Sequence, residues 1–510
     1  MPLGFPFEIG SKLTGRWRYI SLSRQIGGYC WGWLAAGLAF LVISQATRAE
    51  PIELGGRREL FTDDRLVEKQ QNVDWRLCKP QDRGEVLAFD KPWEGAFAGY
   101  ATVIPHDGKL SLYYRGLPVA GKDESDVEVT CYAESTDGVR WTKPELGLFE
   151  VDGSKRNNVL LAHAAPNSHN FSPFLDSNPA ASKEARFKAL AVAHGVDQRG
   201  LVAYISADGI HWEKLREAPV IVGGALDSQN VAFWSEAEGK YVAYYRVYVD
   251  DVRSAARVTS GDFINWSEPE LMSYSDTNST TPSDHLYITQ TQPYFRAPHL
   301  YVSTVGRFVP NRRVVTDEQA QEIGVHPSYF GDVSDVMFMS SRGGAVYDRK
   351  FTDALIKPGI GLSNWVSRTN FPALNVVPSG PDEMSLYVQA GYGQPTHHLR
   401  RYAMRTDGFA AISASRKGGE VTTKPLTFDG SDLSLNFSTS AAGDVRVEIQ
   451  DADGKPLPGY SLDDAVELVG NDIDGIYRWK GTASVKELAG QVVRLRFVLR
   501  DAELYSFQFR

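Results

Sequence analysis

The sequence predicts an all-β protein, a five-bladed β-propeller followed by a C-terminal β-sandwich. The first observation is a recurring turn, Ser135-x-Asp137-Gly138-x-x-Trp141, in which Asp and Gly suit a tight connection between two strands. Complete or degenerate copies end at positions 141, 212, 266, 347 and 411, about one propeller blade apart. The second observation is a series of short segments rich in Val, Tyr, Phe and Thr between turn residues, with one candidate helix at Thr316–Ile323.

Each expected blade opens with two strands joined by a short polar turn. The opening segments are YATVIPHDGKLSLYYRG, FSPFL with RFKALAVAH, QNVAFWSEAEGKYVAYYRV, LYITQTQPYFRAPHLYVSTVGRF and ALNVVPSGPDEMSLYVQAG. Residues 51–92 form an irregular lead-in, and residues 309–332 form a long excursion in blade 4. After Gly418 the alternation of apolar and polar residues predicts a β-sandwich. The expected domains are therefore residues 50–420 for the propeller and 425–510 for the sandwich.

The first 49 residues predict export. Arg16, Arg18 and Arg24 precede an apolar segment at residues 27–44, and Thr47 and Ala49 suit a cleavage site before Glu50. The segment is either a cleaved signal peptide or an uncleaved signal anchor, because its apolar run approaches the length of a membrane span. Both alternatives place the body in the periplasm or outside the cell, with no membrane contact beyond the anchor.

Composition narrows the classes of partner. A net charge of −9 and a pI near 5.7 argue against nucleic-acid binding, which requires a basic surface. Cys78 and Cys131 lie outside the export segment and form either one disulfide or two free thiols. The sequence has no CxxC motif and no cluster of His and Cys, so we expect neither a metal site nor a cofactor.

The direction of the strands sorts the polar residues. In a propeller, the innermost strand of each blade starts at one face, and the second strand returns to that face. The turns that carry Asp137, Asp208, Asp262 and Asp407 then lie on the opposite face, as does Glu383, and their expected role is turn formation. The residues at the starts of the inner strands should face a shared channel mouth.

The predicted site at this mouth combines carboxylates with cationic and amide side chains. Glycoside cleavage uses one protonated and one ionised carboxyl, and neighbouring carboxylates in a partly desolvated channel acquire different pKa values. The expected catalytic residues are Glu94, Asp227 and Asp284. The expected substrate-binding residues are Arg115, Asn170, Arg246, His285, Arg307 and Arg368.

A carbohydrate substrate is expected, and the arginines Arg246 and Arg307 are suited to bind an anionic substituent such as a uronate or sulfate. Trp93 and Trp234 are candidates for stacking on sugar rings, with burial in the core as the rival interpretation. The site as a whole has a rival interpretation too, a polar rim whose ion pairs are only structural.

Two other functions remain open on the residues alone. One is a non-catalytic glycan-binding or scaffold protein of the cell envelope. The other is a metal-assisted lyase or esterase that uses His285, His397 and His398.

The five turns, phrases such as EGKYVAYYR and the C-terminal alternation together resemble the five-bladed propeller glycoside hydrolases, of which families 32 and 43 are the best known. The resemblance implies an exported enzyme acting on furanosides or pentosides, with an inward Asp on blade 1 and a Glu acid near blade 3. This chain has Glu94 where that Asp is expected, and no WMNDPNG, RDP or EC motif. The turns also resemble the Asp boxes of sialidases, which have six blades, an arginine triad and a Tyr nucleophile. Arg115, Arg246, Arg307 and Arg368 sustain that sialidase-like alternative.

Overall fold

The computed structural model describes residues 50–194, 199–481 and 484–510, and the predicted export segment lies outside these ranges. Regular structure in the described residues is almost entirely β. The predicted helix is confirmed as α1 (Asp317–Glu322), whose N-cap Thr316 exchanges hydrogen bonds with Gln319. Three single-turn 3-10 helices are η1 (Lys183–Ala185), η2 (Leu362–Asn364) and η3 (Lys486–Leu488). None of the described helices is long and apolar enough to span a membrane.

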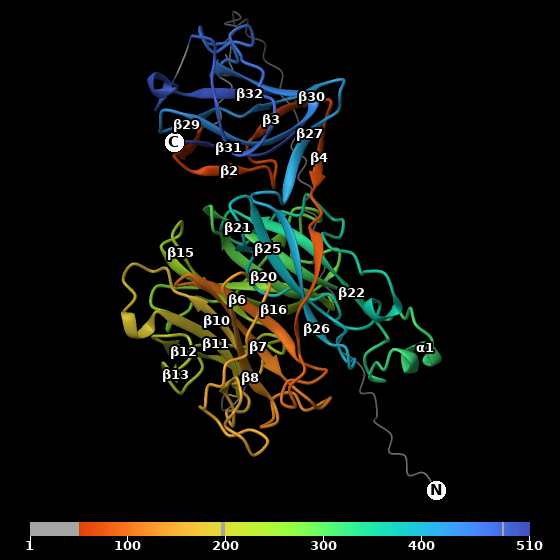
Figure 1. The fold of residues 1–510 in the computed structure, drawn as a ribbon. Helices are drawn as coiled ribbons and strands as arrows, with labels where there is room; N and C mark the ends of the chain where they lie inside the picture. Colours follow the sequence, from red (N-terminus) through yellow and green to blue (C-terminus); the bar gives the residue numbers. More distant parts are fainter. Residues whose placement is uncertain (1–49, 195–198, 482–483) are drawn as a thin grey trace, which may run out of the picture. The chain divides into compact units, whose positions relative to one another are not determined.

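Five antiparallel sheets form the blades of a β-propeller, which confirms the predicted fold class (Figure 1). Within each blade the strands are given from the innermost to the outermost. Blade 1 contains β6 (Gly99–His106), β7 (Lys109–Gly116), β8 (Val129–Ser135) and β9 (Val159–Leu161). Blade 2 contains β10 (Ser172–Leu175), β11 (Phe187–His194), β12 (Arg199–Ser206), β13 (Glu213–Lys214) and β14 (Ile221–Val222). Blade 3 contains β15 (Val231–Ser235), β16 (Lys240–Val249), β17 (Val252–Ser260) and β18 (Glu270–Leu271).

Blades 4 and 5 depart from this regular order at their outer edges. Blade 4 contains β20 (His285–Tyr294), β21 (Ala297–Val309) and β22 (Val333–Ser341), while β19 (Ser273–Tyr274) and β23 (Val346–Tyr347) form a separate parallel pair. Blade 5 contains β24 (Val377–Pro378), β25 (Glu383–Ala390) and β26 (His398–Arg405), and its outer strand is β5 (Gln81–Ala88). This strand lies within residues 51–92, for which the sequence predicts an irregular lead-in. Its pairing with β26 covers the edge of blade 5 and closes the ring between two distant parts of the chain.

The propeller axis is closed by a hydrogen-bonded plug of three side chains. Gln229 Nε2 donates to Thr102 Oγ1 at 2.7 Å, and Gln290 Nε2 donates to Gln229 Oε1 at 2.5 Å. Gln290 Nε2 also donates to the carbonyl of Pro372 at 3.0 Å. All three plug side chains are buried, so they separate the two ends of the channel.

The recurring turns have the local role that the sequence predicts for them. Asp137 Oδ1 accepts the backbone N–H groups of Val139 and Arg140 at 2.9 and 2.8 Å, and Ser135 Oγ accepts that of Gly138. These backbone N–H groups, Arg140 first, hold the pKa of Asp137 below its ordinary value. The copies at Asp208 and Asp262 form the same hydrogen bonds. The three carboxylates are therefore turn-forming groups.

The fifth copy differs from these three. Asp407 is buried, and its carboxylate accepts from Tyr294 and Ser506, both at 2.7 Å. Arg58 and Arg296 contact the same carboxylate at 3.3 and 3.2 Å. Asp407 thus joins blade 4 to strands of the C-terminal sheet, which is a long-range role that its turn motif does not reveal.

The C-terminal sheet has ten hydrogen-bonded strands and draws on both ends of the described chain. From the C-terminal side come β27 (Ala410–Ala414), β28 (Gly419–Thr423), β29 (Leu426–Phe428), β30 (Leu433–Asp451), β31 (Asn471–Tyr477) and β32 (Val493–Phe509). From the N-terminal side come β1 (Ile52–Gly55), β2 (Arg58–Leu60), β3 (Val67–Gln71) and β4 (Val73–Leu77). Figure 1 shows β4 in orange beside β27 in blue, in agreement with their pairing. The predicted lead-in therefore belongs largely to this sheet, and a two-sheet sandwich stays a prediction.

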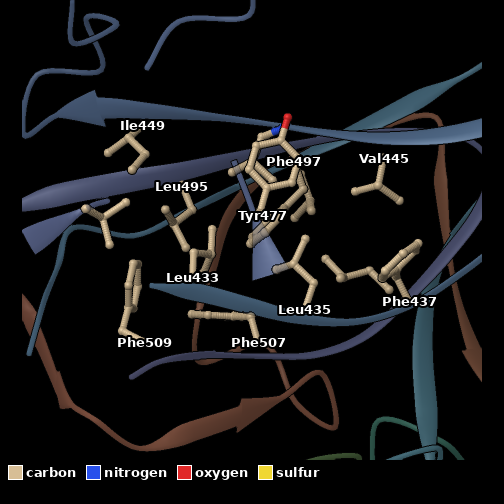
Figure 2. Packing of buried hydrophobic residues seen from close by; sticks show 14 of the residues in the cluster. Leu433, Leu435, Phe437, Val445, Ile449, Tyr477, Leu495, Phe497, Phe507 and Phe509 are labelled. Carbon is tan, nitrogen blue, oxygen red and sulfur yellow. The ribbon is translucent and has the colours of Figure 1, made fainter. Parts of the chain in front are cut away.

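One apolar cluster forms the core of this sheet. Alternate residues of β30 and β32, such as Leu433, Leu435, Leu495 and Phe497, point into it, as Figure 2 shows. The alternation that marked residues 425–510 in the sequence therefore corresponds to burial of one face of each long strand. Elsewhere, Cys78 and Cys131 are both free thiols, which settles the choice that the sequence left open.

Candidate functional site

Arginine and tyrosine side chains from four blades converge at the starts of the inner strands. We call Tyr100, Arg115, Arg246, Arg253, Tyr287, Arg368 and Tyr392 the mouth cluster. The guanidinium carbon of Arg246 lies 4.9 Å from the ring centre of Tyr287, that of Arg253 lies 5.1 Å away, and that of Arg368 lies 5.5 Å away. Three cations thus surround one tyrosine ring, an arrangement stabilised by cation–π attraction.

The second half of the cluster is built around Arg115. Its guanidinium carbon lies 4.6 Å from the ring centre of Tyr100, and its Nη2 donates to Tyr392 Oη at 3.0 Å. Arg368 completes the connection, with its guanidinium carbon 5.8 Å from the Tyr392 ring. Burial raises the pKa of Tyr100 well above its ordinary value, so this phenol stays neutral.

Two of the four arginines have no carboxylate within 4.0 Å among the residues that the structure describes. Arg115 pairs with Asp123 at 3.1 Å, and Arg246 pairs with Asp227. Arg253 and Arg368 have no such partner in the described ranges, although both are at least partly buried. Buried N–H groups are usually hydrogen-bonded. Arg246 Nε, Arg246 Nη1 and Arg253 Nε have no protein acceptor in the described chain. The cluster is therefore suited to bind an anion.

A hydrogen-bonded series fixes the blade 2 side of the site. Glu128 accepts from His169 Nδ1 at 3.0 Å, and His169 Nε2 lies 3.0 Å from the amide nitrogen of Asn170. The other end of that amide, Asn170 Oδ1, lies 3.4 Å from Arg115 Nη1. The series orients the Asn170 amide toward Arg115 and leaves it little rotational freedom.

Residues around the mouth adopt the left-handed backbone conformation, which is unfavourable for non-glycine residues. The φ angles are 48° at Tyr100, 52° at Asn170, 55° at Arg368 and 73° at Asn370. Gln389 holds two of them, because its Oε1 accepts the N–H of Tyr100 at 3.3 Å and its Nε2 donates to the carbonyl of Arg368 at 2.8 Å. Such strain is concentrated at functional sites in many proteins, so its location supports the assignment of the site.

Two carboxyl groups flank the arginines with different electrostatics. Asp227 is half exposed and pairs with Arg246. Asp332 is partly buried and accepts from the hydroxyl of Ser367. Burial raises the pKa of Asp332 above its ordinary value, even though Arg368 and Arg253 act in the opposite direction. Asp227 thus forms an ion pair with an arginine, whereas burial biases Asp332 toward its protonated form.

The structure places six of the nine sequence-predicted residues at the mouth. Asp227, Arg115, Asn170, Arg246 and Arg368 have the contacts given above. The sixth, His285, accepts the backbone N–H of Arg253 at its Nδ1, 3.3 Å away.

Glu94 lies inside blade 1 and not at the mouth. Its side chain is fully buried and bonded to Tyr114 Oη at 2.5 Å and to Lys143 Nζ at 2.6 Å. Asn158 lies 3.5 Å away from the same carboxylate. These partners give Glu94 the surroundings of a structural ion pair, although its PWEG context resembles that of a strand start at a channel rim.

Asp284 and Arg307 lie in a separate pocket of about 550 Å³ on blade 4. Arg307 makes two hydrogen bonds to Asp335, at 2.8 and 2.6 Å, and Asp284 accepts from the buried Arg349 at 2.7 Å. Asp284 precedes β20 and His285 is its first residue, and their side chains have different partners: Arg349 and Arg307 for Asp284, and Arg253 for His285. Only His285 therefore reaches the mouth.

The three histidines of the metal-assisted alternative do not share a site. His397 is buried, with its ring centre 4.7 Å from that of Phe89 and 5.4 Å from that of Tyr392, and burial lowers its pKa to about 3. His398 Nδ1 donates to the backbone carbonyl of Thr396 at 2.6 Å. The described residues contain no group of three His, Cys, Asp or Glu side chains that could hold a metal ion.

Sequence reasoning missed Arg253, Tyr100, Tyr287, Tyr392 and Asp332. Tyr favours strands whatever it contacts, so the tyrosines carry no separate signal in the sequence. Arg253 carries a usable signal, because it is a charged residue near the start of the third strand of blade 3. Asp332 closes the excursion of blade 4, where no periodicity indicates which residues turn inward.

Similarity to known proteins is confined to the fold. No protein-family model and no curated protein matches the chain. A glycosyl hydrolase from Bacteroides ovatus is 14% identical, with a TM-score of 0.39, over 68% of this chain and 93% of its own. An N-acetylgalactosamine deacetylase from F. plautii, solved with blood group B trisaccharide, is 13% identical with a TM-score of 0.42, over 66% and 97%. A structure from the GH130 family of mannoside phosphorylases and glycoside hydrolases is 15% identical with a TM-score of 0.37, over 69% and 96%.

Proposed function

We propose that this protein is an exported glycoside hydrolase that cleaves O-glycosidic bonds of a poly- or oligosaccharide bearing an acidic group. The observation that carries the proposal is the convergence of four arginines and two carboxyls at the channel mouth. Arg253 and Arg368 lack carboxylate partners within 4.0 Å in the described residues, so they are available to a substrate carboxylate or sulfate.

The two flanking carboxyls supply the acid and the base of the reaction. Asp332, whose pKa burial raises, is the proton donor to the leaving oxygen. Asp227, which forms an ion pair with Arg246, activates water or attacks the anomeric carbon. Of the three carboxylates expected from the sequence, this mechanism retains Asp227. It assigns structural roles to Glu94 and Asp284, because their carboxylates are already committed to Lys143 and Arg349.

The test compares three variants on one substrate panel. Asp227→Asn and Asp332→Asn are each expected to lower kcat by about 10²- to 10⁴-fold, the range for loss of a general acid or base. Asp284→Asn serves as the matched control and is expected to keep most of the activity. Product release from uronate-containing oligosaccharides and their carboxyl-reduced counterparts is measured by chromatography, with thermal melting as the folding control. Equal activity of all three variants would overturn the assignment.

A non-catalytic glycan-binding or envelope scaffold protein is the main alternative. The same arginines would then bind an acidic glycan without cleaving it. Binding measured by calorimetry, with no product after prolonged incubation across the panel, would establish this alternative.

The sialidase-like alternative is favoured by one observation, the three arginines around Tyr287. In that mechanism Tyr287 would be the nucleophile, and Tyr287→Phe would abolish turnover. Under the two-carboxyl mechanism, Tyr287→Phe retains turnover because the ring and its cation–π contacts remain. The same kinetic assay therefore separates these two mechanisms.

Export rests on residues 1–49. Fractionation of cells producing the whole chain, compared with a variant that starts at Glu50, is expected to place only the whole chain outside the cytoplasm. Mass spectrometry of the exported form then distinguishes a cleaved signal from an anchor at residues 27–44.

A further inference from the structure

A second pocket lies at the opposite end of the propeller axis from the mouth cluster. We call it the exit pocket; its volume is about 210 Å³. Every blade contributes to its lining, with Pro105 from blade 1, Phe174 from blade 2, Trp234 from blade 3, Gln292 from blade 4 and Asn375 from blade 5. The buried plug of Thr102, Gln229 and Gln290 lies between this pocket and the mouth. The exit pocket is therefore a separate compartment.

The walls of the exit pocket are aromatic and uncharged. Phe174, Phe233, Trp234 and Phe295 line it, and none of its lining residues is Asp, Glu, Lys, Arg or His. Phe295 is 38% exposed, although a large aromatic side chain is normally buried more completely. An uncharged lining gives no attraction for an ion, so its ligand should be neutral.

The pocket also contains hydrogen-bonding groups that the protein does not use. Gln292 is only 8% exposed, and it points to the axis because Gln290, two residues earlier on β20, does so. Its amide has no hydrogen-bond partner among the described residues, and neither has Trp234 Nε1. Asn375 Nδ2 donates to the carbonyl of Val103 at 2.9 Å, which leaves its carbonyl oxygen for a ligand. The pocket thus offers both donors and acceptors beside aromatic rings.

We propose that the exit pocket binds a single neutral sugar ring. A volume of 210 Å³ corresponds to about seven water molecules of liquid, and it is below the range of about 300–1,000 Å³ for drug-sized ligands. One ring therefore fits, and a longer oligosaccharide would have to extend into solvent. The apolar C–H faces of the ring contact the aromatic walls, and its hydroxyls bond to Gln292, Asn375 and the Trp234 N–H. This site does not depend on the function proposed for the mouth.

The test measures binding of three probes to the whole protein by saturation-transfer NMR. The probes are methyl β-D-glucopyranoside, methyl β-D-galactopyranoside and methyl β-D-xylopyranoside. We expect binding of at least one probe. Gln292→Met removes the free amide, and Ala232→Leu fills the pocket, so each should weaken that binding about tenfold or more. Phe295→Ser removes an aromatic wall at the exposed rim of the pocket and should also weaken that binding. Gln81→Met, an exposed change on β5, is the matched control and should bind like the wild type.

Three results would overturn the proposal. The first is an absence of binding for all three glycosides at tens of millimolar. The second is unchanged binding in Gln292→Met and Ala232→Leu, which would place the probes elsewhere. The third is tighter binding of cyclohexanol than of any glycoside, which would make the pocket a site for an apolar group. Arg368→Ala should leave glycoside binding at the exit pocket intact while it weakens binding of acidic oligosaccharides at the mouth. The proposal for the exit pocket can therefore be tested independently of the proposal for the mouth.

Discussion

The two ends of the propeller axis are built from the same five inner strands, and yet they differ in charge. The mouth has four arginines and two flanking carboxyls. The exit pocket has aromatic walls, free amides and no charged lining residue. Four of the five inner strands end in short hairpin turns, and β10 is followed by a longer connection that contains η1. The segments before the inner strands supply Asp227 and Arg368 to the mouth, so the charge of each end depends on which segments reach it.

The largest expected effect concerns stability at Asp407, a buried carboxylate shared by Arg58 and Arg296. Asp407→Asn removes this fully buried partner and leaves both arginines with the partly exposed Asp474, so we expect unfolding to become easier by about 3 kcal/mol. Chemical denaturation measures the change. Turnover per folded molecule should be unaltered, and a selective loss of turnover would contradict the division between the two ends.

The next largest expected effect is a loss of affinity for acidic oligosaccharides at the mouth. Arg368→Ala removes charge-assisted hydrogen bonds worth about 1.5–3 kcal/mol, so acidic oligosaccharides should bind roughly 10- to 150-fold more weakly. Calorimetry on acidic and carboxyl-reduced oligosaccharides provides the measurement. Arg312→Ala, an exposed arginine of the blade 4 pocket, is the control. An equal loss for both variants would mean that net charge, and not the mouth cluster, determines the affinity.

A smaller effect concerns the support of the mouth by Gln389. Gln389→Leu removes the hydrogen bonds to the left-handed residues Tyr100 and Arg368, so we expect KM to rise about tenfold with a smaller change in kcat. Steady-state kinetics beside the control Gln81→Leu would show the split. If Gln389→Leu had the same KM and kcat as the control, Tyr100 and Arg368 would be held by their other contacts, and the hydrogen bonds from Gln389 would be unimportant.

The smallest effect is a pH dependence confined to the mouth. Burial raises the folded-state pKa of Asp332 above its unfolded value, so the protonated group favours folding below the unfolded pKa, and this stability is lost as pH rises through the folded pKa. Asp332→Asn should therefore remove a decrease in melting temperature that begins as the pH rises above about 4, the unfolded-state pKa of Asp. Glycoside binding at the exit, with no titrating lining residue, should stay constant over the same rise in pH.

Features that depend on neighbouring residues could be predicted from the sequence, and features that depend on distant residues could not. The five turns, the short strands and α1 depend on neighbouring residues, so their patterns could be predicted from the sequence, as could the face on which Asp137 and its equivalents lie. Six of the nine predicted site residues lie at the mouth for a similar reason. Four of them lie at or before the start of an inner strand, and Arg115 and Arg246 lie toward the end of a second strand, so the strand direction gives their face of the propeller. Glu94 and Asp284 satisfied that rule as well, and only their buried partners Lys143 and Arg349 reveal where their carboxylates point.

The class of fold and the number of blades therefore follow from the sequence, as does the separation of the polar mouth from the face that carries the turns. Each of these depends on period-two alternation and turn chemistry within a few residues. Only the tertiary structure decided which strands complete the sheets and which side chains meet. The pairing of β5 with β26, the entry of β1–β4 into the C-terminal sheet and the three arginines around Tyr287 join residues far apart in the chain. Such contacts depend on packing across blades, and no local pattern encodes them.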